Sequence, residues 1–168
     1  SLACPPRWGT PRNPDRLTHG PRVGLISEAL GKPLMPWQQH VADVALEVDP
    51  ETGLLAYRTV ILTIPRQSGK TTLMLAVMVH RALGFQYRNV ITYWAQTRMA
   101  ARKKWEDEHL RLLDASPFRQ LYEVRKTNGQ EAIKWSNGSL HGIEANTESA
   151  GHGDTLDLGM LDEAFRQV

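Results

Sequence analysis

The chain has 168 residues, of which 20 are Lys or Arg and 18 are Asp or Glu, and 41% are hydrophobic. This length supports one sizeable core, and the composition excludes intrinsic disorder for most of the chain. The formal net charge of +2 excludes a strongly basic surface, and Cys4, the single cysteine, excludes an intrachain disulfide. The longest apolar run, 73–79, is too short for a membrane span, which needs about 20 residues.

Proline and glycine crowd residues 1–14, which predicts an extended arm without regular structure. Apolar residues at helical spacing predict helices over 21–30 and, with Pro36 in the first turn, over 36–48. A turn is predicted at 49–53. The four arginines of the first part of the chain outnumber its one carboxylate, Asp15, and this local positive charge either is solvated or meets a phosphate backbone: Arg7, Arg12, Arg16 and Arg22.

The segment 57–64 is rich in β-branched residues and nearly continuously apolar, which is typical of a strand buried on both faces of a parallel sheet. Next come a predicted helix over 71–83, apolar on nearly all sides, and a predicted strand over 89–95. An amphipathic helix is predicted over 97–113, with these residues facing the core: Ala101, Trp105, Leu112 and Leu113. The alternation predicts an α/β fold with a mainly parallel β-sheet flanked by helices.

The region after residue 120 changes character and contains short strand-like pieces. Asn137-Gly138 lies between two such pieces, 132–135 and 140–143, and this dipeptide predicts a small β-hairpin insertion. A glycine-rich loop then precedes a final predicted strand over 156–162.

A candidate phosphate loop joins the first predicted strand to the helix that follows it. Gly69-Lys70-Thr71 matches the second half of the pattern G-x-x-x-x-G-K-[S/T], although Ile64 replaces the first glycine. In such a loop the glycine lets the backbone approach the phosphates, the lysine reaches the β and γ phosphates, and the hydroxyl ligates magnesium. The alternative is an ordinary loop in which a threonine caps the helix.

A second candidate motif ends the predicted strand 156–162. Asp162 and Glu163 are adjacent carboxylates at its carboxyl end. In a nucleotide hydrolase, Asp162 would hold magnesium and Glu163 would activate the attacking water. The alternative is that Asp162 caps a helix that begins at Glu163.

Taken together, these motifs resemble the Walker A and Walker B motifs of P-loop NTPases of the additional-strand catalytic-glutamate (ASCE) type, and specifically the ATPase domain of tailed-bacteriophage large terminases. That family replaces the first Walker A glycine and carries Arg-Gln-x-Gly-Lys-Thr, which this chain has at 66–71. The family also has an upstream Trp-Gln element that reads adenine, and Trp37-Gln38 matches it. Alternatively, Trp37 is a core aromatic, Gln38 a solvent-facing amide and Arg66 a surface residue.

The resemblance implies an ATPase that uses Mg²⁺, with an N-terminal arm and helix over 1–33 and a P-loop ATPase domain over 34–168 that is incomplete at its C-terminal end and lacks the nuclease domain. It implies catalytic roles for Glu163, Lys70 and Arg66, and metal ligation by Thr71 and Asp162. Nucleotide binding is implied for the following residues: Gln38, Gln67, Ser68, Gly69, Lys70, Thr71 and Thr72.

By the same resemblance, the chain would power the movement of double-stranded DNA into a procapsid in the cytoplasm of the infected bacterial host. The expected partners are DNA, the portal, the small terminase subunit and further copies of the chain in a ring, with no membrane. The basic run Arg102-Lys103-Lys104 either meets DNA or forms a solvated helix face with ion pairs. Two other functions stay open: a helicase-like DNA translocase, and a fragment that binds nucleotide or an assembly partner without hydrolysis.

Overall fold

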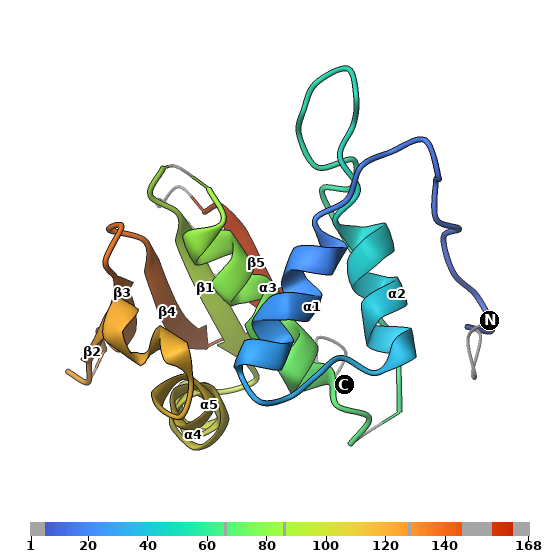
Figure 1. Ribbon diagram of the computed structural model, residues 1–168. Helices are drawn as coiled ribbons and strands as arrows, with labels where there is room; N and C mark the ends of the chain where they lie inside the picture. The colour runs from blue at the N-terminus through green and yellow to red at the C-terminus, as the bar shows by residue number, and fades with distance from the viewer. Residues whose placement is uncertain (1–5, 66, 86, 128, 146–155, 163–168) are drawn as a thin grey trace. The chain divides into compact units, whose positions relative to one another are not determined.

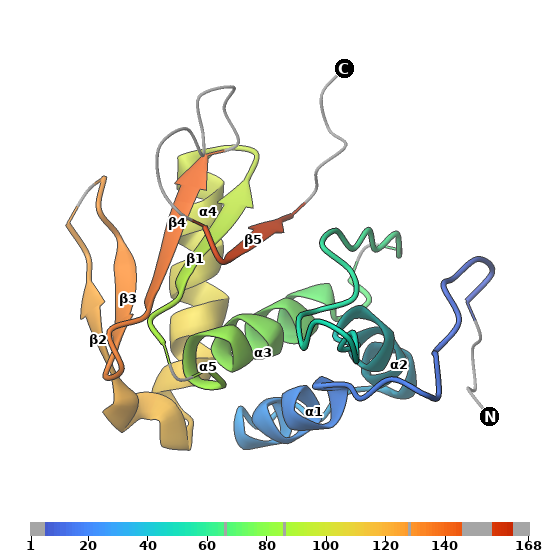
Figure 2. The same ribbon diagram turned by 90° about the horizontal axis from the view of Figure 1, so that it is seen from above.

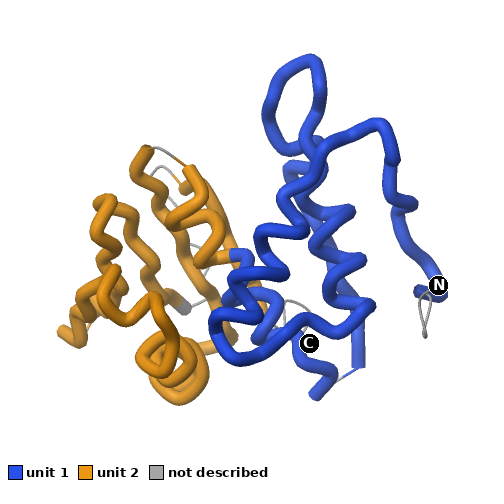
Figure 3. The backbone as a smooth tube through the Cα atoms, viewed as in Figure 1, with its two compact units in different colours: residues 1–77 blue, residues 78–168 orange. Residues whose placement is uncertain are grey.

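The computed structural model describes residues 6–65, 67–85, 87–127, 129–145 and 156–162. The chain divides into two units, Ser1–Val77 and Met78–Val168, which are coloured separately in Figure 3. The division falls inside one helix, α3 (Lys70–Leu83). Each unit is therefore treated by itself below.

Two helices, α1 (Gly20–Ala29) and α2 (Pro36–Ala45), form the first part of unit 1 (Figure 1). Both begin with a proline in the first turn, where the missing N–H costs no helical hydrogen bond. They pack closely, since a Cβ at Gly20 would lie 2.1 Å from Oδ1 of Asp43. Both predicted helices are confirmed, but α2 ends before the predicted residue 48 because Glu47 and Val48 form β-bridges instead.

Part of the N-terminal arm is fixed by a buried carboxylate. The side chain of Glu47 is fully buried, and it pairs with Arg12 at 3.0 Å and with Arg16 at 3.2 Å. The main-chain N–H of Asn13 also donates to it over 2.8 Å. These two arginines are therefore neither simply solvated nor free to meet phosphate, because they neutralise a charge inside the unit.

The strand predicted over 57–64 is wrong, because residues 57–65 are irregular and the described strands do not pair with them. Several of these residues are exposed, including Val60 at 51% and Ile61 at 75%. Apolar, β-branched residues show that a segment suits a sheet, but a strand also needs a hydrogen-bonded neighbour, which composition does not specify. The turn predicted at 49–53 is confirmed by the hydrogen bond from Gly53 N to Asp49 O, 2.8 Å.

Helix α3 begins at the candidate phosphate loop and is buried along most of its length. Its apolar residues from Leu73 to Ala82 are almost all below 9% exposed, as the sequence predicts. The C-terminal end is bound by a turn that is distant in sequence. Nδ2 of Asn137 and Oγ of Ser139 donate to the carbonyl of Ala82 over 2.7 and 3.0 Å.

Unit 2 contains a five-stranded sheet in the order β2-β3-β4-β1-β5 (Figures 1 and 2). Its strands are β1 (Val90–Ala95), β2 (Tyr122–Arg125), β3 (Ala132–Trp135), β4 (Leu140–Ala145) and β5 (Leu158–Leu161). β1 is parallel to β4 and to β5, whereas the pairs β2·β3 and β3·β4 are antiparallel. The fold is α/β as predicted, but the sheet is mixed rather than mainly parallel, because the hairpin strands extend it on one side.

The predicted hairpin is confirmed as β3 and β4. The loop closes with hydrogen bonds from Trp135 N to Ser139 O, 2.9 Å, and from Gly138 N to Trp135 O, 2.8 Å. Gly138 has φ of +85°, a conformation that glycine adopts without steric cost.

The predicted helix over 97–113 is also confirmed, as a continuous helical run of α4 (Arg98–Lys104), the π-helix η1 (Trp105–Leu110) and α5 (Arg111–Asp114). A short 3₁₀ helix, η2 (Pro117–Leu121), follows. Thr97 caps α4, since its side chain accepts a hydrogen bond from Ala100 N over 3.1 Å. Ala101, Trp105 and Leu113 are fully buried as predicted, whereas Leu112 is only half-buried. Helix α4 packs on β1 and β4 (Figure 2).

Candidate nucleotide-binding site

The candidate phosphate loop has an unusual backbone conformation. Gln67 has φ of +59° and Gly69 has φ of +87°, so two of three successive residues are left-handed. Glycine adopts this conformation freely, but it is uncommon for a residue such as glutamine. Loops that mix left-handed residues with ordinary ones can turn successive N–H groups toward one point, where an anion binds. The loop backbone is therefore suited to phosphate.

The residues after the loop form the first turn of α3. Lys70, Thr71 and Thr72 are half-buried, and the turn contains no acidic residue. The first N–H groups of a helix lack intrahelical acceptors, and the helix dipole adds partial positive charge at this end. A lysine and two hydroxyls in this turn supply the donors and the oxygen ligand that a metal-bound triphosphate needs.

Gln38 connects helix α2 to this loop. Its Nε2 donates to the main-chain carbonyl of Gly69 over 2.8 Å, and its Oε1 accepts from Met35 N over 2.7 Å. The side chain is buried, with 2% exposed, so it is not the solvent-facing amide of the alternative interpretation. A glutamine amide has two N–H groups and two lone pairs, so these bonds use half of its capacity. Contact between Gln38 and adenine stays a prediction.

Gly69 is also closely packed against two side chains of the α2 N-terminus. A Cβ there would lie 2.9 Å from Nε2 of Gln38 and 2.9 Å from Cε of Met35. A side chain at residue 69 would therefore displace the ends of these two side chains, including the Gln38 amide that bonds to the loop. The structure thus brings Gln38 and the phosphate loop together within unit 1.

In unit 2, Asp162 directly follows β5. Its N–H donates to Trp94 O over 2.9 Å, which continues the parallel pairing of β5 with β1. Gly159 leaves room for the Trp94 ring, because a Cβ there would lie 2.8 Å from it. Asp162 is 5% exposed, and its Oδ2 accepts from Tyr93 Oη over 2.8 Å and from Lys104 Nζ over 2.9 Å.

Two predicted catalytic residues, Arg66 and Glu163, lie outside the described residues. Their roles therefore stay predictions, and so does the alternative in which Asp162 caps a following helix. Gln67 is exposed and Ser68 is half-buried, both in the loop where the sequence places them.

Two residues of the basic run on α4, Arg102 and Lys104, form ion pairs, and so does Arg98 on the same helix. Arg102 pairs with Glu106 at 3.1 Å and with the buried Glu131 at 3.4 Å, and Arg98 pairs with Glu131 at 2.6 Å. Burial would raise the pKa of Glu131, but the hydrogen bond from Arg98 and the charges of both arginines outweigh this and lower it. These contacts favour the ion-paired helix face over a DNA-binding surface.

Two histidines of unit 2, His109 and His141, are fully buried. The ring centroid of His109 lies 5.0 Å from that of Tyr93 and 5.7 Å from that of His141. Burial lowers the pKa of His141 to about 4, and burial together with the charges of His141 and Lys104 lowers the pKa of His109 well below its ordinary value. Both rings are therefore neutral at pH 7. Among the described residues, no group of three or more His, Cys, Asp and Glu side chains is placed to hold a metal ion.

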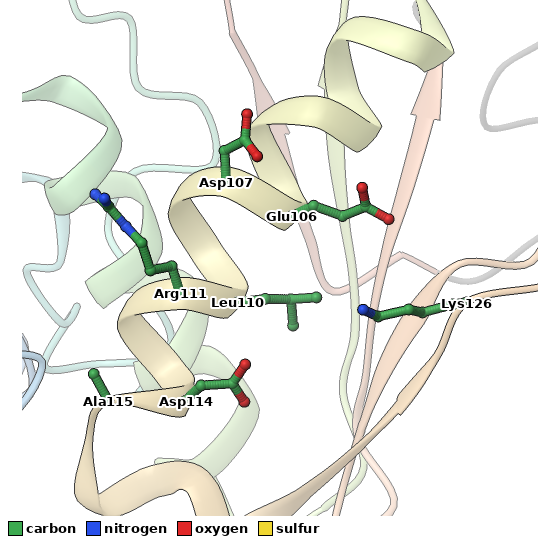
Figure 4. A pocket seen from close by; sticks show the side chains of 7 residues that line it. All are labelled: Glu106, Asp107, Leu110, Arg111, Asp114, Ala115 and Lys126. Carbon is green, nitrogen blue, oxygen red and sulfur yellow. The ribbon is translucent and has the colours of Figure 1, made fainter.

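A surface pocket of unit 2 lies on the face of η1 and α5 (Figure 4). Its lining combines three carboxylates with two basic side chains and two apolar ones: Glu106, Asp107, Asp114, Arg111, Lys126, Leu110 and Ala115. A second pocket, on α1 and α2, contains the acidic Glu28 and Asp43 and no Lys or Arg. Because carboxylates repel a triphosphate, neither pocket competes with the loop as a nucleotide site.

The donor types present fit a magnesium-bound nucleotide. Magnesium takes oxygen ligands, typically one or two carboxylates or hydroxyls together with phosphate and water oxygens. Asp162 and Thr71 are of this type. Sequence reasoning missed Tyr93 and Lys104, which both contact the Asp162 carboxylate, because they are 69 and 58 residues away along the chain and belong to no motif.

The family model described as "Terminase large subunit, T4likevirus-type, N-terminal" matches residues 61–167. Among solved structures, the chain is similar to the HK97 bacteriophage large terminase, with a TM-score of 0.70 and 19% sequence identity over 88% of this chain. The match covers 31% of that protein, so the chain spans about a third of its length. No curated protein matches the sequence. Among the described residues, no helix is long and apolar enough to cross a membrane.

Proposed function

The chain belongs to the terminase large-subunit family, and we propose that it is the ATP-hydrolysing part of a motor that moves double-stranded viral DNA into a procapsid. The observation that carries this proposal is the phosphate loop. Its left-handed residues, Gln67 and Gly69, lead into the N-terminus of α3, and Gln38 fixes the loop from α2. We assign the domain to the ASCE type of P-loop NTPases.

In this proposal, the loop backbone and the α3 N-terminus hold the phosphates, with Gln67, Ser68, Gly69 and Thr72 contributing contacts. Lys70 and Arg66 neutralise the charge that develops on the γ phosphate. Gln38 recognises adenine with the N–H and the lone pair that its two internal bonds leave.

The remaining residues act on water and on the metal. Glu163 accepts a proton from the attacking water. Thr71 and Asp162 hold Mg²⁺, which when bound would neutralise phosphate charge and orient the β and γ phosphates. The partners would be DNA, the portal, the small terminase subunit and neighbouring copies of the chain in a ring, in the cytoplasm of the infected host.

A calorimetric titration with magnesium ATP tests the binding part of this proposal. We expect saturable binding that Lys70→Ala abolishes, because the lysine ammonium is a direct phosphate partner. The matched control is Lys32→Ala, which removes an exposed lysine of the same unit and should leave the affinity unchanged. Equal heats from all three proteins, or none from a folded wild-type chain, would refute the proposal.

Phosphate release tests the catalytic part. Glu163→Gln keeps the size and hydrogen-bonding oxygen of the side chain but removes the base. We therefore expect it to bind ATP as the wild type does while turnover falls about 100-fold or more. A Glu163→Gln chain that hydrolyses ATP at the wild-type rate would exclude Glu163 as the base.

A further inference from the structure

The Asp162 carboxylate already has a cation beside it. Nζ of Lys104, the last residue of α4, lies 2.9 Å from Oδ2 of Asp162, and Tyr93 Oη donates to the same oxygen over 2.8 Å. The side chain of Asp162 is 3% exposed and that of Lys104 is 27% exposed. The lysine ammonium is therefore placed between solvent and a buried negative charge.

This arrangement has an electrostatic consequence. A buried carboxylate is costly unless a positive charge compensates it, and here Lys104 supplies that charge. A second cation at the same carboxylate would be repelled by the first across a few ångströms of poorly solvated protein. A divalent ion that binds Asp162 must therefore displace the lysine or bind more weakly beside it.

We propose that Lys104 is a resident counter-ion of Asp162 that competes with Mg²⁺ and so sets the Mg²⁺ concentration at which the site fills. This inference rests on the proposed role of Asp162 as a magnesium-holding carboxylate. Lys104 is a positioning residue in this scheme, since it acts through Asp162. It also stands where α4 changes into the π-helix η1, a type of irregularity that is frequent at functional sites.

A purely structural ion pair would behave differently from a competing one. If Lys104 only balances charge, its removal lowers stability by the same amount at every divalent-ion concentration. If Lys104 competes, its removal lowers stability without the ion but strengthens binding of the ion. The sign of the change in metal affinity therefore separates the two roles.

The test measures binding of Mn²⁺ alone to the chain, by electron paramagnetic resonance of the free ion. Lys104→Met keeps most of the side-chain volume and removes the charge, and we expect about tenfold tighter Mn²⁺ binding. The matched control is Lys103→Met, which makes the same change at the exposed neighbouring lysine and should stay within about twofold of the wild type. The double variant Lys104→Met, Asp162→Asn should lose the gain in Mn²⁺ affinity, because the carboxylate that binds the ion is gone.

Two further variants keep the proposal falsifiable if Lys104→Met folds poorly. Lys104→Arg retains the cation and should bind Mn²⁺ like the wild type. Tyr93→Phe removes the hydrogen bond from Tyr93 Oη to Asp162 Oδ2 without removing a charge, so it should not show the tenfold gain in Mn²⁺ affinity. Equal Mn²⁺ affinities for folded Lys104→Met and Lys103→Met, or an equal gain in Tyr93→Phe, would overturn the proposal.

The same proteins separate failure of this inference from failure of the proposed function. A Mg²⁺ titration at fixed ATP should show that Lys104→Met reaches half-saturation at lower Mg²⁺ than Lys103→Met. If the chain binds no ATP but Lys104→Met still gains Mn²⁺ affinity through Asp162, the counter-ion role stands and the nucleotide function fails. If ATP binds and the two variants show the same Mg²⁺ dependence, the counter-ion role fails.

Discussion

Nε2 of Gln38 donates to the main-chain carbonyl of Gly69 over 2.8 Å, and this bond joins two segments 31 residues apart. Because Oε1 of the same side chain accepts from Met35 N, one buried amide satisfies the start of α2 and the phosphate loop together. The loop conformation and the beginning of α2 are therefore coupled.

Gln38→Ala should weaken both stability and ATP binding. Loss of the amide leaves Met35 N and Gly69 O without these partners, which should reduce the free energy of unfolding by about 2 kcal/mol. Urea denaturation and calorimetry measure the two effects. The control is Gln39→Ala, which removes a hydrogen bond to Asp43 on the half-buried side of α2 and should leave ATP affinity unchanged. Equal ATP affinity for the two variants would contradict the coupling.

Gly69→Ala should be more harmful than alanine at other left-handed glycines. Positive φ alone costs a non-glycine residue about 1–2 kcal/mol. At Gly69 the added Cβ also meets Gln38 and Met35 at 2.9 Å, whereas at Gly31 and Gly53 it meets nothing within 4 Å. Thermal unfolding of the three alanine variants measures the difference. If Gly69→Ala lowers the thermal stability no more than Gly31→Ala does, the Gln38 side chain moves aside easily and its packing on the loop is not rigid.

Glu47→Gln should destabilise the chain at pH 7 but not in acid. Burial would raise the pKa of Glu47, but hydrogen bonds from Asn13, Arg16 and Arg12 outweigh this and lower the pKa below 4.5. The ionised form therefore contributes stability that is present above pH 4.5 and is lost as the pH falls through the lowered value. We expect Glu47→Gln to lower the free energy of unfolding by about 2 kcal/mol at pH 7 and by less below pH 4. The exposed Glu51→Gln serves as control, and a loss that is independent of pH would contradict the ionic role.

The buried histidines should make the fold sensitive to mild acid. Their pKa values are lowered from 6.5, to about 4 for His141, so the unfolded chain binds protons that the folded chain does not. Stability is therefore fully present above pH 6.5 and falls toward pH 4, by up to about 1.4 kcal/mol per pH unit for each histidine. The charge of Lys104 also lowers the pKa of His109, the charge of Asp162 raises it, and the uncharged Tyr93 ring packs against the imidazole.

Urea denaturation at pH 7.5 and pH 5.5 measures this effect. His141→Phe removes one titrating ring at nearly constant volume, so the difference between the two pH values should shrink. Gln39→Ala, which leaves both buried histidines in place, should retain the wild-type difference. If the difference in the free energy of unfolding between the two pH values is unchanged in His141→Phe, His141 takes up protons equally in the folded and unfolded chain.

Predictions that depended on neighbouring residues were confirmed, whereas predictions that depended on contacts between distant segments were wrong. Pro36, the amphipathic pattern over 97–113 and Asn137-Gly138 each act on their own neighbourhood, and the helices and the hairpin that they predict are confirmed. The strand over 57–64 was wrong because its apolar pattern says nothing about a pairing partner. The mixed sheet was missed because strand order depends on contacts between distant segments.

The same contrast between local and long-range features applies to the candidate site. Gly69-Lys70-Thr71 could be identified because the loop and helix that it needs are contiguous in sequence. The partners of Asp162 could not, because Lys104 reaches it from the end of a helix and Tyr93 from a neighbouring strand. Neither residue type is distinctive in those positions, so only the fold identifies them.

Helix α3 also has a mechanical consequence. It begins with Lys70 at the phosphate loop and ends where Asn137 and Ser139 hold the carbonyl of Ala82. A helix of 14 residues is about 21 Å long and resists compression, because every turn is hydrogen-bonded to the next. Within unit 2, both donors to the Ala82 carbonyl belong to the turn between β3 and β4, so the two hydrogen bonds would stretch or break together if that turn moved away from the end of α3.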